Sequence, residues 1–499
     1  MVVIYAEKSS LAKTIAGALG AGKRIPHPDE PTVGYYQFKF KGEDAILCHG
    51  VGHLAQLVPA KSYDEKYTKW DLSIFPCVPD EFRSAAKAQT IKCLKLVKSF
   101  LYKADWAINA TDPDREGELI FAYVCDVCKY SKPIKRVWIE DLTNEKIIKA
   151  FKNLKEQHEQ ISEQLSGCAA DLQLAGRARD IADWLVGNNL TVAATKKFGG
   201  FDNLISVGRV QTPTLAMVVN REKQIQSHVK TPFWKVIADF NVNGQHFEAD
   251  HEHGNFENEA EANSVKATCN GKDGVVVDKQ IKHKTVSAPL LYNATQLQIA
   301  AAKILNWESD KTMSVMQNLY EHKLMTYPRT SSEHLTEAMM PEVKTTLSKI
   351  LTMPEYSKYA LPEEQWSAFS SRHFDDKKVG SHPAIIPTVN VPGNLSGISD
   401  DEKLLYDLLV KSILRIIYPK SELDETSVII DVNNNKFKAL GSVITNPGWY
   451  AVDAMPESKK TLPNVEKGIK YPGTYSVRKG ETEPPKRFTE ATLLAAMEL

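Results

Sequence analysis

Strand-like and helical patterns alternate through the first part of the chain. Four short segments are typical of β-strands, at residues 2–7, 35–40, 45–50 and 106–111. The first is followed by a helical pattern that Ser9 and Ser10 can cap, and the last by a helical pattern over 118–130. This alternation predicts an α/β domain with a mainly parallel sheet. Ligands of such sheets gather at the carboxyl ends of the strands, where Glu7 and Asp112 lie.

The rest of the chain divides into blocks of different periodicity. Residues 144–225 and 290–352 are mostly helical in pattern, and strand character is concentrated at 233–281 and 427–444. Strand segments on both sides of a helical block indicate a β domain that is interrupted by an inserted helical domain. The predicted fold class is therefore multidomain, with α/β, helical and β parts.

Size, charge and cysteine content narrow the class of protein. A chain of 499 residues is too long for one core, so several domains are expected. Its 62 Lys and Arg balance its 62 Asp and Glu, so any affinity for nucleic acid must come from a local patch. No stretch is typical of a transmembrane helix or a secretion signal, and seven cysteines in so long a chain fit a reducing cytoplasm. The pair Cys125 and Cys128 is expected to be two helix-borne thiols, one of them buried, rather than a zinc site.

An acidic segment follows the strand at 106–111. Its carboxylates Asp112, Asp114 and Glu116 stand at alternate positions, so in an extended backbone they project to the same side. Like charges held together stay ionised most easily around a divalent cation, and a ligand set made only of oxygens favours Mg²⁺. The alternative is a solvated acidic loop, the usual fate of a charge run. The apolar segments on either side favour the metal site, because they direct the loop to the edge of the sheet.

Glu7 and Lys8 end the first strand and join this site if that strand neighbours the one leading to Asp112. A carboxyl group in such surroundings has the raised pKa that general acid–base catalysis needs. Lys8 stands at a helix start, a slightly unfavourable place for a cation, which indicates a function. The alternative is an ordinary surface lysine.

One glycine pattern imitates an ATP-binding loop. Gly17, Gly22 and Lys23 have the required spacing, but Arg24 stands where a Ser or Thr would bind Mg²⁺. These glycines also end a helix, whereas a phosphate-binding loop precedes one and offers the helix N-terminus to the phosphate. The sequence therefore gives no indication of ATP use.

A tyrosine lies in an extended segment after a helix that is expected to end near Lys323. Tyr327 precedes Pro328, which disfavours helix, and Arg329 shares its side of an extended backbone. A phenol beside a guanidinium suits attack on a phosphodiester, because arginine holds phosphate oxygens and stabilises developing charge. On spacing alone, a buried tyrosine near an arginine is also common. His382, in a proline-braced turn, is by itself more typical of a structural histidine.

Five motifs together resemble those of type IA DNA topoisomerases, in that family's order and at roughly its spacings. They are AEK (6–8), TDPDREGELI (111–120), SVGRVQTPTLAMVV (206–219), LMTYPRTSS (324–332) and SHPAIIPT (381–388). The match runs from Met1 to the C-terminus and is highly specific. The AEK opening, DPDREGELI and TYPRTSS are similar to topoisomerase III rather than topoisomerase I.

The resemblance implies an N-terminal Toprim domain followed by a toroidal core. The implied domains are Toprim at 1–150, the first part of a helical gate-base domain at 151–220, the first part of a β hinge domain at 221–285, an inserted helical domain that carries the tyrosine at 286–415, the second part of the β hinge at 416–485, and the start of the returning gate-base domain at 486–499. The family continues beyond this point. We therefore expect a truncated gate-base domain, in which cleavage persists while strand passage or stability is impaired.

The resemblance also implies roles for individual residues. Tyr327 would be the nucleophile that forms a 5′-phosphotyrosine bond, and Arg329 would stabilise the attacked phosphate. Glu7 would handle the proton on the 3′-oxygen with help from Lys8, and His382 would contact the region of the scissile phosphate. Mg²⁺ would be held by Asp112, Asp114 and Glu116, with Glu7 beside them, and single-stranded DNA by Arg177, Arg179, Asp183 and Gln211.

The implied substrate is DNA with single-stranded segments, either negatively supercoiled or catenated. A phosphotyrosine bond conserves the energy of the phosphodiester, so no ATP is needed. Residues 171–230 hold eight Lys or Arg against five Asp or Glu, a basic excess of three (8 − 5 = 3), which suits a strand-binding track. A helicase partner, a monomeric state and a cytoplasmic location away from membranes are further expectations. The alternatives are another Toprim enzyme, such as a nuclease or primase, and a non-catalytic remnant that only binds single-stranded DNA.

Overall fold

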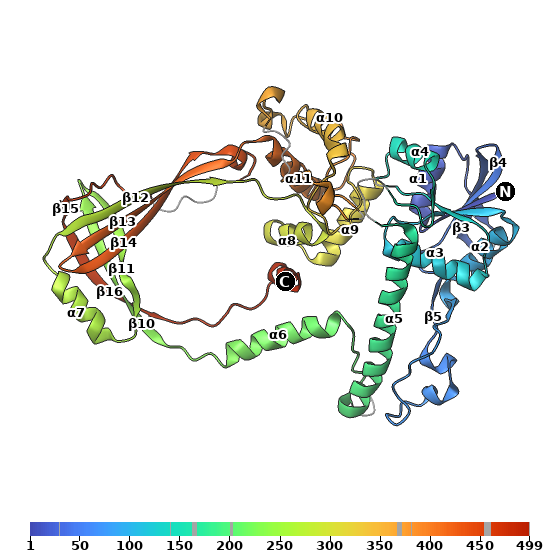
Figure 1. Ribbon diagram of the computed structural model, residues 1–499, viewed down its shortest axis with the longest axis horizontal. Helices are drawn as coiled ribbons and strands as arrows, with labels where there is room; N and C mark the ends of the chain where they lie inside the picture. The colour runs from blue at the N-terminus through green and yellow to red at the C-terminus, as the bar shows by residue number, and fades with distance from the viewer. Residues whose placement is uncertain are drawn as a thin grey trace.

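The structure of the protein, a computed structural model, describes residues 1–28, 30–139, 141–161, 167–199, 203–366, 372–380, 382–453 and 461–498. Ser381, which opens one of the motifs, and Leu499 lie outside these residues. The elements follow one another around a ring in Figure 1: an α/β domain, two long helices, a β-sheet, and a helical block that returns to the α/β domain. Within the described residues, no helix combines the length and apolar content needed to cross a bilayer. The architecture is the multidomain one expected from the sequence.

The α/β domain is built on a seven-stranded sheet with the order β2-β3-β4-β1-β7-β8-β9. The central strands β4, β1, β7 and β8 run parallel, and the outer pairs are antiparallel. The strands are β1 (Val2–Ala6), β2 (Ile25–His27), β3 (Glu30–Phe40), β4 (Glu43–His49), β7 (Trp106–Ala110), β8 (Ile134–Arg136) and β9 (Lys155–Glu156). Since β1 lies directly between β4 and β7, the residues that follow these three strands meet at one edge of the sheet.

Helices and a small hairpin complete this domain. They are α1 (Ser9–Leu19), α2 (Ile91–Lys103), α3 (Arg115–Cys128), α4 (Asn144–Lys152) and the hairpin of β5 (Ala55–Leu57) and β6 (Ser84–Ala86). Helix α1 begins one residue earlier than its serines predicted: Lys8 occupies the N-cap position, and no side chain caps the helix. It ends at Gly20, whose φ of 70° is the left-handed conformation that glycine adopts readily. Cys125 and Cys128 are free thiols on α3, and the first is buried, as expected.

Two helices connect the α/β domain to the second sheet. Helix α5 (Ala169–Ala194) packs against α3, and α6 (Gln211–Gln226) continues along the base of the ring in Figure 1. The α3–α5 contact is close because of Gly176: a Cβ atom there would lie 2.6 Å from the carbonyl oxygen of Arg115. Helix α5 is therefore fixed directly behind the acidic loop.

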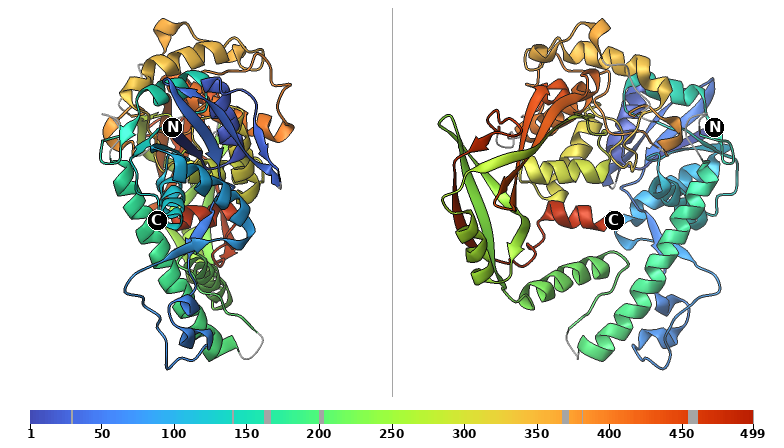
Figure 2. Two further views of the ribbon diagram at one scale, coloured as in Figure 1. Left: turned by 90° about the vertical axis from the view of Figure 1, so that its right-hand side faces the viewer. Right: turned by 60° about the vertical axis from the view of Figure 1, so that its left-hand side comes forward.

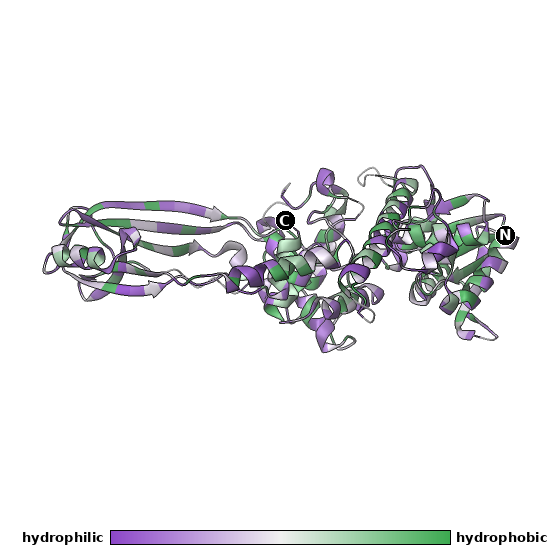
Figure 3. Cartoon of the chain, turned by 90° about the horizontal axis from the view of Figure 1, so that it is seen from below, coloured by the Kyte–Doolittle hydropathy of each residue, from purple (hydrophilic) through white to green (hydrophobic). Residues whose placement is uncertain are grey.

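The second sheet is antiparallel and joins two separate parts of the chain. Its order is β15-β12-β13-β14-β11-β10-β16. The strands before the helical block are β10 (Pro232–Val242), β11 (Gln245–Phe256) and β12 (Gly274–Val286), and those after it are β13 (Ser421–Val432), β14 (Asn435–Asn446), β15 (Lys470–Tyr471) and β16 (Gly473–Glu481). Val286 pairs with Ser421, so the chain leaves the sheet and re-enters it at one place. Figure 3 shows hydrophilic and hydrophobic positions alternating along these strands, whose buried side chains form a separate core with α7 (Glu259–Cys269).

The helical block contains α8 (Ala294–Ile304), α9 (Ser309–Glu321), α10 (Met340–Ile350) and α11 (Asp400–Leu414). Two of the motifs run side by side through it: Thr326 N donates to Ile386 O at 3.0 Å, and Thr330 Oγ1 donates to His382 O at 3.0 Å. The last helix, α12 (Glu490–Met497), lies against α8 in both Figure 1 and Figure 2. The two motifs are thus one paired structure rather than two loops.

The helical block and the α/β domain are in contact in this structure. One hydrophobic core includes Ala6 of β1 together with Leu319 and Tyr320 of α9. Polar contacts surround this core, including Ser10 Oγ to Glu321 Oε1 at 3.1 Å, Lys323 Nζ to Asn144 Oδ1 at 2.8 Å, and Lys146 Nζ to Glu342 Oε2 at 2.7 Å. The ring is therefore closed.

A buried ion pair inside the α/β domain makes a stability prediction. Arg136 Nε donates to Glu118 Oε1 at 2.5 Å, and both side chains are almost fully buried. Glu118→Gln leaves the guanidinium without its counter-charge and should destabilise the domain by about 3 kcal/mol. Hydrogen exchange of the β1 and β7 amides measures this change. Asp44→Asn, which breaks the Lys39–Asp44 pair whose side chains are 66% exposed, should cost less than about 1 kcal/mol; equal losses in the two variants would contradict the prediction.

Candidate active site

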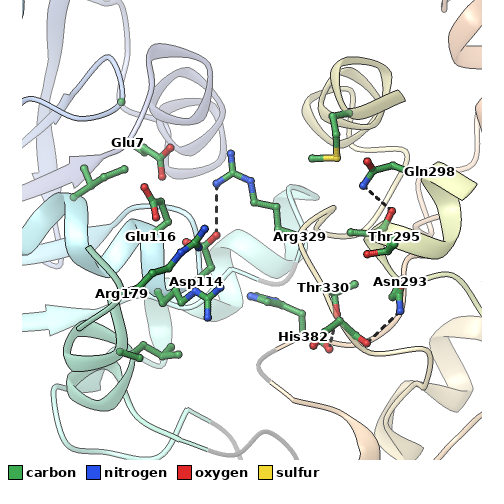
Figure 4. A pocket seen from close by; sticks show the side chains of 18 of the residues that line it. Glu7, Asp114, Glu116, Arg179, Asn293, Thr295, Gln298, Arg329, Thr330 and His382 are labelled. Atoms are coloured by element: carbon green, nitrogen blue, oxygen red, sulfur yellow. Dashed lines mark hydrogen bonds and ion pairs between the residues drawn. The ribbon is translucent and has the colours of Figure 1, made fainter. Parts of the chain in front are cut away.

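A cleft of about 910 Å³ lies between the α/β domain and the helical block. Figure 4 shows Glu7, Asp114 and Glu116 on one wall and Thr330 and His382 on the other, with Arg329 reaching across toward Asp114. The remaining lining residues are Gly52, His53, Arg115, Ile120, Leu172, Ala175, Arg179, Asn293, Ala294, Thr295, Gln298, Met313, Ser331 and Glu498. Motifs separated by more than two hundred residues in the chain therefore share one cavity.

The acidic segment is part turn and part helix. Asp114 is the N-cap of α3, and its Oδ1 accepts from Gly117 N at 2.7 Å. Gly117 is required here, since a Cβ atom would lie 2.1 Å from the carbonyl oxygen of Asp112. Because the cap starts α3 at Arg115, Glu116 lies in the first helical turn, so the extended backbone expected for this segment is wrong, although Asp114 and Glu116 line the same cleft.

Each acidic side chain has its own surroundings. Asp112 is 4% exposed and lies beside Lys8, whereas Glu116 Oε1 lies 2.6 Å from His53 Nε2. The hydrogen bond with His53 lowers the pKa of Glu116 below its ordinary value. Within the described residues, no group of three or more His, Cys, Asp or Glu has the geometry of a metal site. The carboxylates are gathered in one region but do not converge on one point.

Lys8 balances the buried carboxylates. Its Nζ lies 3.3 Å from Glu7 Oε1 and 3.5 Å from Asp112 Oδ2. Burial raises the pKa of Asp112 to about 6, with Glu7 adding to the increase and Lys8 opposing it. Burial also lowers the pKa of Lys8, but attraction to Asp112 and Glu7 outweighs this effect and leaves the pKa above its ordinary value. Glu7 Oε2 is buried and has no hydrogen-bond partner among the described residues.

Tyr327 meets the acidic loop directly. Its hydroxyl donates to Asp114 Oδ2 at 2.8 Å, across 213 residues of sequence. The residue is 2% exposed, and burial, followed by the charges of Asp114 and Asp112, raises the pKa of the phenol well above its ordinary value. Arg329 Nη1 lies 3.7 Å from the same Asp114 oxygen and opposes this increase. The phenol is therefore neutral in the closed site.

His382 contacts both walls. Its Nε2 donates to the carbonyl oxygen of Pro113, and its ring centroid lies 4.6 Å from that of Tyr327. The structure thus brings together Glu7, Lys8, Asp112, Asp114, Tyr327, Arg329 and His382, with Glu116 at the edge of the same cleft.

The residues expected along a DNA track separate into two groups. Arg179 lines the cleft, and Asp183 and Gln211 line an adjoining hollow beside α5 and α6. Asp183 connects the two, because its carboxylate lies 3.8 Å from Arg179 and 3.0 Å from Arg209. Arg177 does not join them: it pairs with Asp126 at 2.7 Å and lies over the Tyr123 ring on α3. On helix α5, Arg177 and Arg179 are two positions apart and so point in different directions.

Two residues of the site, His53 and Arg209, were not expected from the sequence. His53 follows β4 just as Glu7 follows β1 and Asp112 follows β7, so its place at a strand end was a usable indication. Arg209 had no such indication, because its role depends on the packing of the segment before α6 against α5.

The raised pKa of Asp112 gives a prediction about stability and pH. The folded carboxyl titrates at about 6 instead of 3.8, so the folded state binds more protons in this window and loses stability as the pH rises through it. Asp112→Asn should therefore be more stable than the wild type at pH 7.5 in EDTA, by on the order of 2 kcal/mol, and the advantage should vanish near pH 4. Thermal unfolding at both pH values measures this, with exposed Asp80→Asn as the control. A less stable Asp112→Asn at pH 7.5 would refute the electrostatic account.

Comparisons with known proteins agree with this geometry. A family model described as DNA topoisomerase matches residues 169–499, and one described as Toprim domain matches residues 2–142. The chain is 35% identical to DNA topoisomerase 3 of Bacillus licheniformis and 34% identical to that of Bacillus subtilis, with 99% of this chain and 67% of each relative covered. In fold it matches full-length topoisomerase I from Thermotoga maritima with a TM-score of 0.71 at 23% identity, covering 99% of this chain and 75% of that one. The chain belongs to the type IA DNA topoisomerases and is of the topoisomerase III kind.

Proposed function

We propose that this topoisomerase cleaves and rejoins one DNA strand in the cleft where Tyr327 meets Asp114. The observation that carries the proposal is the 2.8 Å hydrogen bond between these side chains, which joins the tyrosine motif to the acidic loop. The alternatives are not favoured. A nuclease or primase would share only the Toprim match, and a non-catalytic DNA-binding remnant would not need the tyrosine motif to meet the acidic loop.

Tyr327 is the proposed nucleophile. Its oxygen bonds to the phosphorus, the bond from phosphorus to the 3′-oxygen breaks, and the 5′-phosphate remains on the tyrosine. The phenolic proton passes to Asp114, which already accepts it in a hydrogen bond. Because burial and Asp114 hold the pKa of Tyr327 high, the phenolate forms only as the phosphate accepts its charge. Arg329 beside Asp114 is suited to hold the phosphate oxygens during this step.

Glu7 and Lys8 are the proposed partners of the leaving group. Glu7 passes a proton from solvent to the departing 3′-oxygen, and Lys8, whose Nζ lies 3.3 Å from Glu7 Oε1, stabilises the charge that develops there. Rejoining reverses these transfers, so the energy of the broken bond is kept in the phosphotyrosine link and no ATP is consumed. His382 is proposed to hold the tyrosine ring and contact the phosphate region.

The Toprim and type IA families use Mg²⁺, and the carboxylate oxygens of this cleft are the ligand type that such an ion takes, although among the described residues they do not converge on one point. Glu7 Oε2 is buried and has no hydrogen-bond partner among the described residues, so this carboxylate oxygen is available to a cation. Asp112, Asp114 and Glu116, with Glu7, are the proposed ligands. When bound, Mg²⁺ supplies positive charge beside the phosphate and the 3′-oxygen.

We propose that the domains expected from the sequence move relative to one another during strand passage. The helical domain at 286–415 moves away from the Toprim domain at 1–150 and opens the ring for a second strand. The β hinge at 221–285 and 416–485 carries this movement, and the gate-base segment at 151–220 stays with the Toprim domain. The segment at 486–499 connects two parts in this structure, because Arg487 pairs with Glu222 of α6 and Glu490 accepts from Ser309 N of α9. The polar contacts around the interface core support a separable contact.

DNA is the substrate of this enzyme. We further propose that it acts as a monomer, because one chain supplies every residue of the cleft. A helicase is the proposed partner, since it produces the single strands that the cleft requires. The free cysteines support the cytoplasm as its location.

Replacing the nucleophile tests the chemistry. Tyr327→Phe should give no covalent adduct with labelled single-stranded DNA in Mg²⁺, while its affinity for the DNA stays within about twofold. The assay is denaturing electrophoresis of the labelled protein band. Tyr320→Phe is the matched control, because Tyr320 is buried beside it with ring centroids 5.5 Å apart. An adduct that persists in Tyr327→Phe, or disappears equally in Tyr320→Phe, would rule out the assignment.

Two neighbouring arginines test the strand-binding track. Arg179→Ala should weaken binding of a single-stranded oligonucleotide by about tenfold at low salt and reduce the salt dependence, because it removes a cation from the cleft. Arg177→Ala removes the same charge from the side that faces Asp126 and should change the affinity by less than about twofold. Fluorescence anisotropy at several salt concentrations measures both. Equal losses would mean that the track does not follow the cleft.

A further inference from the structure

Trp138 contacts the histidine that holds the tyrosine ring. Its indole is stacked on His382, with centroids 5.3 Å apart and planes 10° apart. His382 Nε2 donates to the Pro113 carbonyl oxygen, which requires the proton on Nε2, and the imidazole ring also contacts the Tyr327 ring. Trp138 belongs to the α/β domain, whereas His382 and Tyr327 belong to the helical block. The stack therefore crosses the contact between the two halves.

The indole is positioned by its ring contacts rather than by a polar group. Trp138 Nε1 is buried and has no hydrogen-bond partner among the described residues. Ile161 of the α/β domain and Val379 of the helical block form a small hydrophobic cluster with the ring. The guanidinium of Arg136 lies over the indole at 5.4 Å. Both halves of the molecule thus define where this ring lies.

The same guanidinium also fixes the backbone of the acidic loop. Arg136 Nη1 donates to Thr111 O at 2.9 Å, and Nη2 donates to Asp112 O at 2.8 Å. Its charge is balanced by Glu118, away from the cleft. One buried cation therefore holds both the loop that carries Asp112 and the indole that meets His382. A displacement of the indole changes the alignment of the histidine with this loop.

We propose that Trp138 is a positioning residue for strand cleavage. By stacking on His382, it fixes the position of the imidazole relative to the acidic loop when the α/β domain and the helical block are in contact. The imidazole in turn positions the Tyr327 ring. The inference rests on the proposed role of Tyr327 as the nucleophile. An aromatic pair contributes enough energy to change a rate by about three- to tenfold, which is the size of the expected effect.

The test separates alignment from folding and from DNA binding. Single-turnover formation of the covalent adduct on a labelled single-stranded oligonucleotide gives the cleavage rate constant in Mg²⁺, and fluorescence anisotropy without Mg²⁺ gives the affinity. Trp138→Leu removes the ring, and Trp138→Phe keeps an aromatic face. Trp307→Leu is the control, since Trp307 is a buried tryptophan of the helical block whose ring is covered by Lys311.

The expected result is a cleavage rate about three- to tenfold lower in Trp138→Leu at unchanged affinity, recovery in Trp138→Phe, and a wild-type rate in Trp307→Leu. A wild-type rate in Trp138→Leu, a Phe variant as slow as the Leu variant, or parallel losses of rate and affinity would overturn the proposal. If Trp138→Leu does not fold, Trp138→Met, which has a flexible side chain without a ring, takes its place. Absence of an adduct with the wild-type chain would instead refute the role of Tyr327.

Discussion

The carboxylate of Asp114 fixes the relation between the two halves of this enzyme. One of its oxygens caps α3 by accepting from Gly117 N, and the other accepts from the Tyr327 hydroxyl and faces Arg329. Because both oxygens are used, the side chain cannot rotate without losing either the helix cap or the hydrogen bond from the tyrosine. The start of α3 and the position of the nucleophile are therefore set together.

Charge is the second constraint on the site. Glu7, Asp112 and Asp114 are drawn together at the end of a parallel sheet, where the burial of Glu7 and Asp112 makes negative charge costly. In this structure Lys8 and Arg329 supply the compensating positive charge from inside the protein. The site is therefore organised before its substrate arrives.

The sequence predicted which segments meet at the site better than it predicted the backbone of the acidic loop. Strand ends located Glu7 and Asp112 correctly, since apolar strands of a parallel sheet must bring their carboxyl ends to one edge. Alternation failed for Glu116, because the Asp114 cap started the helix earlier than an extended pattern allowed. Motif resemblance included Arg177 with Arg179, although helical geometry turns them apart. Arg209 and Trp138 could not be placed, because their contacts are tertiary ones with distant residues. The assignment of roles to these residues stays a prediction.

The pairing of Val286 with Ser421 has a mechanical consequence. Both connections between the second sheet and the helical block leave from adjacent strands at one end of that sheet. Two adjacent connections form a hinge. They allow the helical block to rotate about one axis and restrict its sliding or twisting relative to the sheet. A helical block that swings out on such a hinge returns along the same arc. A covalently held DNA end would then come back to the place where it was cut, which is what faithful rejoining requires.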